Sequence, residues 1–236
     1  PGAFVTKVDA GATYASVPVT TTISRNNANY VTQYSNYDAY GNPMTVAETG
    51  PNGGSKSTTL SYNLNTTKWI INQRKNESFT GSSITRSFDA NGKKKKKNVD
   101  GVITSYSYDS QGNVSVITYP RGLTHTFSNY YRGIPRFESQ PEAISISRVV
   151  SDAGNVTAET NGEGYTTNYS YDGLNRVTSI IPPLGNTVFI SYGTASKTAT
   201  RGILSESTIY DGFGKPTSVT LGGITTSYRY DTLGRM

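Results

Sequence analysis

The feature that most restricts the fold of this chain is a Tyr-Asp motif that recurs along it. In the close copies Gly or Asn follows three positions after the Asp, often with Arg or Lys next. Five copies are close, and two that begin at Phe88 and Ser151 are weaker. The motif residues are Tyr37, Asp38, Gly41, Phe88, Asp89, Gly92, Tyr108, Asp109, Gly112, Asp152, Gly154, Tyr171, Asp172, Asn175, Arg176, Tyr210, Asp211, Gly214, Tyr230, Asp231, Gly234 and Arg235. Such repetition predicts a repeat architecture.

The motif has a period of about 20 residues. Its Asp residues are separated by 51, 20, 43, 20, 39 and 20 positions, and the gaps near 40 indicate two units with one eroded motif. Eroded copies are expected to begin at Tyr62, Tyr131 and Tyr192. A step of this length accommodates two short strands and their turns.

The residues before the motif alternate between two kinds of side chain. Segments 101–109, 164–172 and 223–231 align without a gap, each with Gly eight positions before Asp. Because successive strand residues point to opposite faces, rings and β-branched groups gather on one face and short polar groups on the other. In the last copy the first face holds Ile224, Thr226, Tyr228 and Tyr230, and the second holds Thr225, Ser227 and Arg229.

The motif itself has the chemistry of a turn. An Asp at a strand end accepts hydrogen bonds from backbone N–H groups about two residues on, and Gly adopts positive φ without strain. Asn175 stands where Gly is usual and is the best substitute for it. Each unit is therefore predicted to be a β-hairpin that is marginal alone and must stack edge to edge. We expect equivalent tyrosine rings of successive hairpins to stack, at roughly 0.2–1 kcal/mol per pair.

The expected fold is all-β, with stacked antiparallel hairpins of about 20 residues that form a continuous curved or spiral sheet. Leu, Ile, Val and Phe together make 46 of 236 residues, which favours a thin sheet interface over a thick core. We expect residues 1–29 to form an irregular or eroded repeat segment. Residues 30–236 are expected to form one continuous repeat domain that is truncated at both ends.

The units at 101–118, 164–181 and 223–236 resemble the YD-repeat or RHS-repeat family, whose units read roughly as Gly, several residues, then Tyr-x-Tyr-Asp-x-x-Gly-Arg. In that family long arrays wind into a hollow β-shell. Bacterial members enclose a toxic carboxy-terminal domain, and animal relatives of the teneurin type are adhesion receptors. The cleavage that frees the cargo in some members is not carried over, because this chain ends before the segment that performs it.

The resemblance implies a structural, non-catalytic segment of a secreted or cell-surface bacterial protein. Such a segment would help to encapsulate or present a toxin or effector domain that lies outside this chain. The implied partners are the rest of the parent shell protein and an enclosed carboxy-terminal cargo domain. The alternative is an adhesion module that binds carbohydrate or a cell surface, with surface glycans as partners. A β-rich glycosidase has the least support.

The sequence offers few groups for catalysis, and we expect no catalytic, cofactor-binding or metal site. His125 is the single histidine and is interpreted as a strand residue, because no nucleophile or orienting group is signalled. The densest acidic pairs are Glu138 with Glu142 and Glu159 with Glu163. Both pairs are interpreted as solvated charges in loops beside Gly or Pro. With no Cys, a thiolate metal site is excluded.

The net charge of +6 comes mainly from the run Lys93–Lys97, which supplies five of the six charges. No basic stripe with interleaved aromatics accompanies it, so specific nucleic-acid binding is not expected. The run occupies the outgoing strand of the Phe88-Asp89 unit, where like charges are costly in a packed sheet. No stretch approaches the roughly 18 apolar residues of a membrane-spanning helix.

Overall fold

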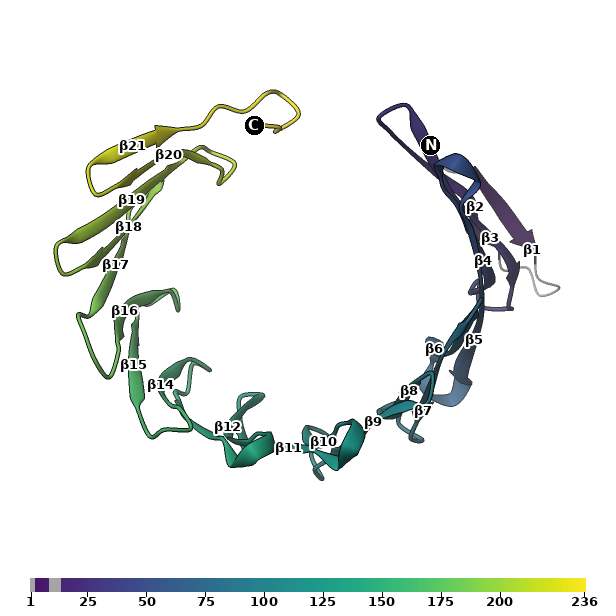
Figure 1. Ribbon diagram of the computed structural model, residues 1–236, viewed down its shortest axis with the longest axis horizontal. Coiled ribbons are helices and arrows are strands. Elements are labelled where there is room, and N and C mark those ends of the chain that lie inside the picture. The colour runs from purple at the N-terminus through teal and green to yellow at the C-terminus, as the bar shows by residue number, and fades with distance from the viewer. Residues whose placement is uncertain (1–2, 9–13) are drawn as a thin grey trace. The chain divides into compact units, whose positions relative to one another are not determined.

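The computed structural model describes residues 3–8 and 14–236, with side chains from residue 17 onward. These residues form β-strands joined by short turns (Figure 1). The chain divides into two compact units, Pro1–Tyr108 with Val116–Leu123, and Asp109–Ser115 with Thr124–Met236. Each unit is a separate stretch of hairpins and is described by itself.

The first unit is one antiparallel ladder in which each strand pairs with the next along the chain. Its strands are β1 (Ala3–Val8), β2 (Tyr14–Arg25), β3 (Ala28–Tyr37), β4 (Pro43–Thr49), β5 (Ser55–Asn65), β6 (Ile70–Phe79), β7 (Ser82–Phe88), β8 (Lys94–Val99) and β9 (Val102–Tyr108). Short 3-10 turns lie at η1 (Pro51–Gly53), η2 (Thr66–Lys68) and η3 (Pro120–Gly122). Strand β10 (Val114–Thr118) has residues in both units.

The second unit repeats the same arrangement, and here too each strand pairs antiparallel with its successor. Its strands are β11 (Thr124–Tyr131), β12 (Ile134–Ser139), β13 (Ser145–Val150), β14 (Val156–Thr160), β15 (Thr166–Tyr171), β16 (Val177–Ile181), β17 (Val188–Tyr192), β18 (Ser196–Arg201), β19 (Leu204–Tyr210), β20 (Pro216–Leu221) and β21 (Ile224–Ser227), with a 3-10 turn at η4 (Pro141–Ala143). The predicted all-β fold of stacked antiparallel hairpins is confirmed.

The ladder is irregular at the residue that comes before several of the corners, which are the tight turns between paired strands. Ser170 pairs with Ser179, but Tyr171 pairs with Val177, so the register shifts there. Equivalent shifts occur at Phe88, Val150 and Tyr210. A type I turn followed by a left-handed residue and a bulge joins strands in this way. The left-handed position explains why Gly or Asn recurs third after the Asp.

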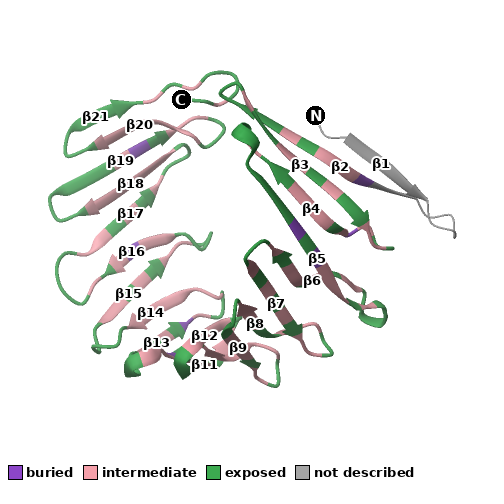
Figure 2. Cartoon of the chain, turned by 45° about the vertical axis from the view of Figure 1, so that its right-hand side comes forward, coloured by how far each residue is buried: buried purple, intermediate pink, exposed green. Residues whose placement is uncertain are grey.

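The apolar core of each unit is thin. Among the side chains that the structure describes, the buried apolar ones are Val17, Leu60 and Val150. Figure 2 shows the strands mostly in the colours of intermediate and exposed residues. A single sheet without a second layer cannot bury either face fully, so backbone pairing carries much of the cohesion.

The amino-terminal segment already contains ladder strands. Part of the expected eroded segment 1–29 lies in β1 and β2, and β2 pairs with β3 from Thr20 to Arg25. The proposed division at residue 30 stays a prediction. Residues 1–2 and 9–13 lie outside the described residues.

The lysine run lies in a paired strand, as its place in the repeat predicted. Residues 94–97 belong to β8, which pairs with β7 on one side and β9 on the other. The ammonium of Lys94 lies 4.5 Å from the centre of the Tyr106 ring, and that of Lys93 lies 5.2 Å from the Tyr108 ring. Cation–π contacts of this kind reduce the cost of adjacent like charges. No helix in the described ranges is long and apolar enough to cross a bilayer.

Candidate functional site

The Asp of the repeat motif closes the corner between two strands. Asp172 is representative: its Oδ1 accepts hydrogen bonds from the backbone N–H groups of Leu174 at 2.9 Å and Arg176 at 3.0 Å. Its Oδ2 accepts a further bond of 2.7 Å from Nε of Arg176. Two backbone bonds complete the corner, from Asp172 N–H to the Arg176 carbonyl and from Asn175 N–H to the Asp172 carbonyl, both 3.0 Å.

The same pair of Oδ1 bonds, to the second and fourth residues after the Asp, recurs in six corners. These corners are formed by Asp38, Asp89, Asp109, Asp172, Asp211 and Asp231. The third residue after the Asp has positive φ in each, for example 94° at Gly112 and 60° at Asn175. Glycine, which has no Cβ atom, and Asn adopt this left-handed backbone conformation at the lowest energetic cost.

The hydrogen bonds of the corners also lower the pKa of several Asp carboxyl groups. The backbone N–H of Arg176 lowers the pKa of Asp172 most, and the Arg176 side chain adds to the effect. In Asp109 the side-chain amide of Asn113 has the largest share in lowering the pKa. The pKa values of Asp89 and Asp231 are lowered chiefly by backbone N–H groups. These carboxylates are held ionised as hydrogen-bond acceptors, a state suited to a turn and unsuited to proton donation.

The corner between β13 and β14 corrects one residue of the predicted motif. Ser151, and not Asp152, takes the Asp position: Ser151 N–H bonds the Asn155 carbonyl at 2.8 Å, and Oγ of Ser151 accepts from Asn155 N–H at 3.2 Å. Gly154 is then third after the corner residue, as elsewhere. Asp152 is shifted by one and accepts a bond of 2.6 Å from the Tyr131 hydroxyl. The predicted alignment of the motif was wrong here. The turn requires its left-handed residue three positions after the corner residue, and Gly154 lies three positions after Ser151 but only two after Asp152.

Tyrosine hydroxyls tie six of the described hairpins to the hairpin that precedes each of them. The Tyr171 hydroxyl donates a hydrogen bond of 2.7 Å to the Val156 carbonyl, which is the first strand residue after the previous corner. Five more tyrosines bond a backbone carbonyl in their preceding hairpins, at the same place in four of them and, for Tyr37, at Pro18 within β2. The pairs are Tyr37 with Pro18, Tyr62 with Pro43, Tyr108 with Lys94, Tyr130 with Val114, and Tyr192 with Val177. Burial raises the pKa of Tyr62, Tyr108, Tyr130 and Tyr171, which keeps these phenols protonated as donors.

This bonding replaces the predicted columns of stacked rings. In the described part of the chain the ring pairs are Tyr40 with Trp69 and His125 with Phe127, and neither joins two repeat tyrosines. Equivalent tyrosines lie two strands apart, about 9.6 Å at the usual strand spacing, whereas ring pairs interact within about 7 Å. The phenol therefore contacts the neighbouring hairpin through its hydroxyl and not through its face.

The structure also locates the eroded corners. Tyr62 and Tyr192 make the repeat bond at two of the expected positions. At the third, Tyr130 makes it in place of Tyr131. One corner of this type was missed: Oδ1 of Asn161 accepts from the N–H groups of Glu163 at 3.1 Å and Tyr165 at 3.0 Å. The spacing of Asn161 to Gly164 matches that of Asp to Gly in the motif and could have revealed it.

Of the four acidic residues considered for catalysis, Glu138 and Glu159 lie on strands and are held by one arginine, whereas Glu142 and Glu163 lie in turns, as predicted. Arg148 forms a salt bridge to Oε1 of Glu138, and its Nε lies 2.7 Å from Oε2 of Glu159. Nε2 of His125 lies 3.1 Å from Oε2 of Glu138, and its ring stacks on Phe127 with centroids 4.0 Å apart. The assignment of Glu138 and Glu159 to loops was wrong, since they lie in β12 and β14. Cross-strand pairing brings them together as an ion-paired cluster, with no free acid and base facing a cleft.

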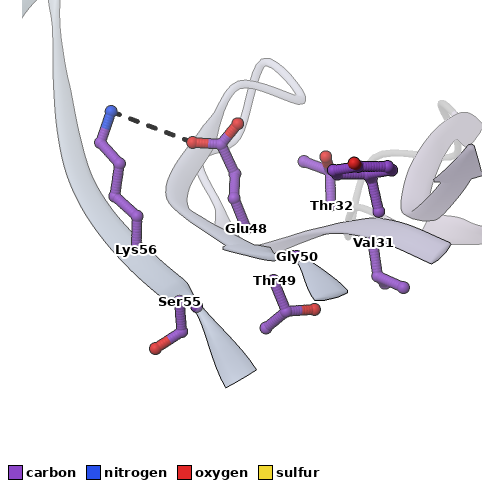
Figure 3. Close-up of a pocket in the computed structure, with 9 residues that line it drawn as sticks. Val31, Thr32, Glu48, Thr49, Gly50, Ser55 and Lys56 are labelled. Atoms are coloured by element: carbon purple, nitrogen blue, oxygen red, sulfur yellow. Dashed lines mark ion pairs between the residues drawn. The ribbon is translucent and has the colours of Figure 1, made fainter. Parts of the chain in front are cut away.

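The pockets of the structure are open depressions over the sheet. One of about 330 Å³ lies over β3, β4 and β5, where Nζ of Lys56 is 4.0 Å from Oε2 of Glu48 (Figure 3). Another of about 630 Å³ is lined by residues 192–197 and by the corner residues Tyr210, Asp211, Gly212 and Gly214. Among the hydrogen bonds of the described residues, none joins a hydroxyl to a basic side chain in either pocket. Across residues 3–8 and 14–236, no three His, Asp or Glu side chains are grouped to hold a metal ion.

Comparison with known proteins relates this geometry to a family. Among the solved structures that match the fold is the Tc holotoxin pore of Photorhabdus luminescens, with 17% identity over 99% of this chain and a TM-score of 0.51. A TcdB2–TccC3 complex matches with 16% identity over 92% of this chain and a TM-score of 0.53. The same complex without its hypervariable carboxy-terminal region matches with 16% identity over 98% of this chain and a TM-score of 0.50. The match spans 12% of each of those chains.

No curated protein sequence matches the chain. A family model described as RHS Repeat matches residues 84–124 and 151–187, which include the corners at Asp89, Asp109, Ser151 and Asp172. The resemblance that the motif indicated is thereby confirmed, and these two segments of the chain are RHS repeats.

Proposed function

We propose that this chain is a structural, non-catalytic segment of a larger secreted RHS-repeat protein, in which it forms part of the wall that encloses or presents an effector domain. The partners are the remaining repeats of the parent protein and a carboxy-terminal cargo domain outside this chain. The observation that carries the proposal is the repeated bond from a tyrosine hydroxyl to the backbone of the preceding hairpin.

That bond supports a wall because it acts between hairpins and not within one. A repeat that cannot bury its own apolar face depends on its neighbours for stability, and a bond that recurs between successive hairpins lets the array extend without a thick core. The polar groups of the motif are used by the same scaffold, since the Asp carboxylates accept from their own turns. A wall built in this way has no need of an active site in each repeat.

The comparisons support the same role. Proteins of similar fold occur in Tc toxin complexes, and one of those structures is described as lacking a hypervariable carboxy-terminal region. A variable region beyond a common repeat array is what an interchangeable cargo would require. This chain matches only 12% of the length of those proteins, which leaves room for a cargo domain elsewhere in a parent protein of similar length.

Electron microscopy of the full-length parent protein tests the proposal. We expect a hollow particle whose wall is one sheet thick, with additional density inside that disappears when the carboxy-terminal domain is deleted. A straight, solid rod, or a particle whose repeats surround no volume, contradicts the proposal. Limited proteolysis gives a second measurement: the cargo should be protected in the intact protein and cleaved once the wall is opened by denaturant.

A further inference from the structure

The chain contains a chemically labile dipeptide, Asn followed by Gly, in three of its turns. The pairs are Asn52-Gly53, Asn91-Gly92 and Asn161-Gly162. Asn is among the thermolabile residues, because the backbone nitrogen of the next residue can attack its side-chain amide carbon and form a cyclic imide. Gly has no side chain to obstruct that attack. A fold that holds the amide or packs the glycine slows the reaction, since the turn must first open locally.

The pair in the corner between β7 and β8 is held on both reacting groups. The N–H of Gly92 donates a hydrogen bond of 3.1 Å to the Asp89 carbonyl. Oδ1 of Asn91 accepts a hydrogen bond from Nζ of Lys68, which orients the side-chain amide. A Cβ atom at Gly92 would lie 2.6 Å from Cδ1 of Ile70, so the glycine is closely packed. This pair is therefore protected by the fold.

The pair that begins at Asn161 is protected in a different way. Oδ1 of Asn161 accepts hydrogen bonds from the backbone N–H groups of Glu163 at 3.1 Å and Tyr165 at 3.0 Å. These two bonds fix the orientation of the side-chain amide. A Cβ atom at Gly162 would meet Cγ2 of Ile144 at 2.7 Å, so this glycine packs against the turn η4. Attack on the amide requires these contacts to break.

The pair at Asn52 lies in the turn η1, between β4 and β5, and has neither form of protection. Asn52 and Gly53 are exposed, and the Asn52 side chain forms no hydrogen bond with any described residue. A Cβ atom at Gly53 or Gly54 would meet nothing within 4 Å. One backbone bond closes the turn, from the Gly50 N–H to the Gly54 carbonyl at 2.8 Å. Two consecutive glycines after Asn52 give the backbone wide conformational freedom.

Two other turns have the same backbone geometry without the labile residue. Asn52 follows the proline of η1 and has φ 67° and ψ 24°. The residue after the proline is Arg121 in η3, at φ 71° and ψ 8°, and Glu142 in η4, at φ 68° and ψ 24°. The turn thus requires a left-handed residue but not an amide. A substitution that the chain already uses in η3 can therefore remove the amide of Asn52 and keep the turn.

We propose that the fold directs spontaneous deamidation to Asn52. The backbone nitrogen of Gly53 loses its proton to hydroxide and bonds to Cγ of Asn52, and the side-chain nitrogen leaves as ammonia. Water then opens the cyclic imide at either carbonyl, which gives isoaspartate or aspartate. Each event adds one negative charge to an exposed turn, and isoaspartate also lengthens the backbone by one carbon. The modification does not depend on the proposed role of the chain as a wall.

Peptide mapping by mass spectrometry tests the proposal. The intact chain is kept at about pH 8.5 and about 37 °C, in buffer or in about 8 M urea, and the gain of about 1 Da is followed at each Asn-Gly pair. We expect Asn52 to react at least about tenfold faster than Asn91 and Asn161 in buffer, and all three at similar rates in urea, where no local structure protects them. Equal rates in buffer, or the same preference for Asn52 in urea, overturn the proposal.

Two variants identify the site through the isoaspartate content of the aged chain, measured with an isoaspartyl methyltransferase. Asn52→Arg reproduces the Pro-Arg-Gly sequence of η3, so the turn should form and most of the isoaspartate should disappear. Asn27→Arg is the matched control, because it places the same charge at another exposed, left-handed Asn that Ala28 follows, and it should leave the content unchanged. An isoaspartate content that Asn52→Arg does not lower contradicts the proposal.

Discussion

The hydroxyl of Tyr171 donates a hydrogen bond of 2.7 Å to the backbone carbonyl of Val156, fifteen residues earlier and in the preceding hairpin. The bond joins a side chain that comes just before one corner to the backbone that comes just after the previous corner. Because the acceptor is a backbone group, the bond depends little on which residue occupies position 156. This accounts for an array in which the acceptors include Pro43, Lys94 and Val177.

Removal of this hydroxyl should weaken the array. We expect Tyr171→Phe to lower the free energy of unfolding by about 0.5–1.5 kcal/mol, because the ring is kept and one hydrogen bond is lost. Urea denaturation followed by circular dichroism measures the change. Tyr169→Phe, at a tyrosine of the same strand for which the described contacts include no hydroxyl bond, is the control. Equal effects of the two substitutions would show that the hydroxyl bond contributes nothing.

The corner aspartates should make the protein sensitive to acid. The pKa values of Asp89, Asp109, Asp172 and Asp231 are lower in the folded chain than the ordinary value. A lowered folded pKa stabilises the fold above the unfolded pKa of about 3.9, and this contribution disappears as pH falls through the folded pKa. We expect stability to decline below about pH 4, with a smaller decline in Asp172→Asn. A decline unchanged in that variant argues against a role for the Asp172 charge.

A Cβ atom at the left-handed residue of a corner should destabilise the fold, whereas a Cβ atom at another glycine of the same corner should not. Gly214 has φ of 78°, whereas Gly212, in the same corner, has an ordinary backbone conformation, and a Cβ added to either meets open space. We expect Gly214→Ala to lower the free energy of unfolding by about 1 kcal/mol and Gly212→Ala to leave it unchanged or raise it slightly. The two melting temperatures, compared under one condition, decide the matter. A reversed order would mean that conformation at residue 214 is not limiting.

Arg148 should be the most sensitive charged residue of the second unit. It is 16% exposed and lies between Glu138 and Glu159. Arg148→Met should cost about 2 kcal/mol or more, because two carboxylates are then left close together without their cation. Arg136→Met serves as control, since Arg136 bonds only the exposed Asn129 among the described hydrogen bonds. Denaturant midpoints of the two variants should differ clearly, and similar midpoints would refute the prediction.

The corners were predictable because their contacts are local. Asp172, Leu174 and Arg176 lie within five positions, and the turn needs only an acceptor followed by a residue tolerant of positive φ. The same rule explains the error at Asp152: the spacing to Gly154 decides the register, and Ser151 supplies a weaker acceptor than the adjacent acid.

The cross-strand contacts were not predictable in the same way. Glu138, Arg148 and Glu159 meet because three strands pair in one register, which no local pattern records. Trp69 is similar: the sequence predicted an eroded copy of the motif at Tyr62, but not that the residues after it form an exposed tip at which Trp69 contacts Tyr40.

By itself the sequence determined the repeat, its period, the chemistry of each corner and the all-β fold, because these follow from backbone preferences over a few residues and from strict alternation along a strand. Only the tertiary structure decided how hairpins are joined, which acids share a cation and which aromatic ring is left in solvent. The physical reason is the spacing of strands: neighbours about 4.8 Å apart bring distant residues into contact, and equivalent rings, two strands apart, reach one another only through the backbone between them.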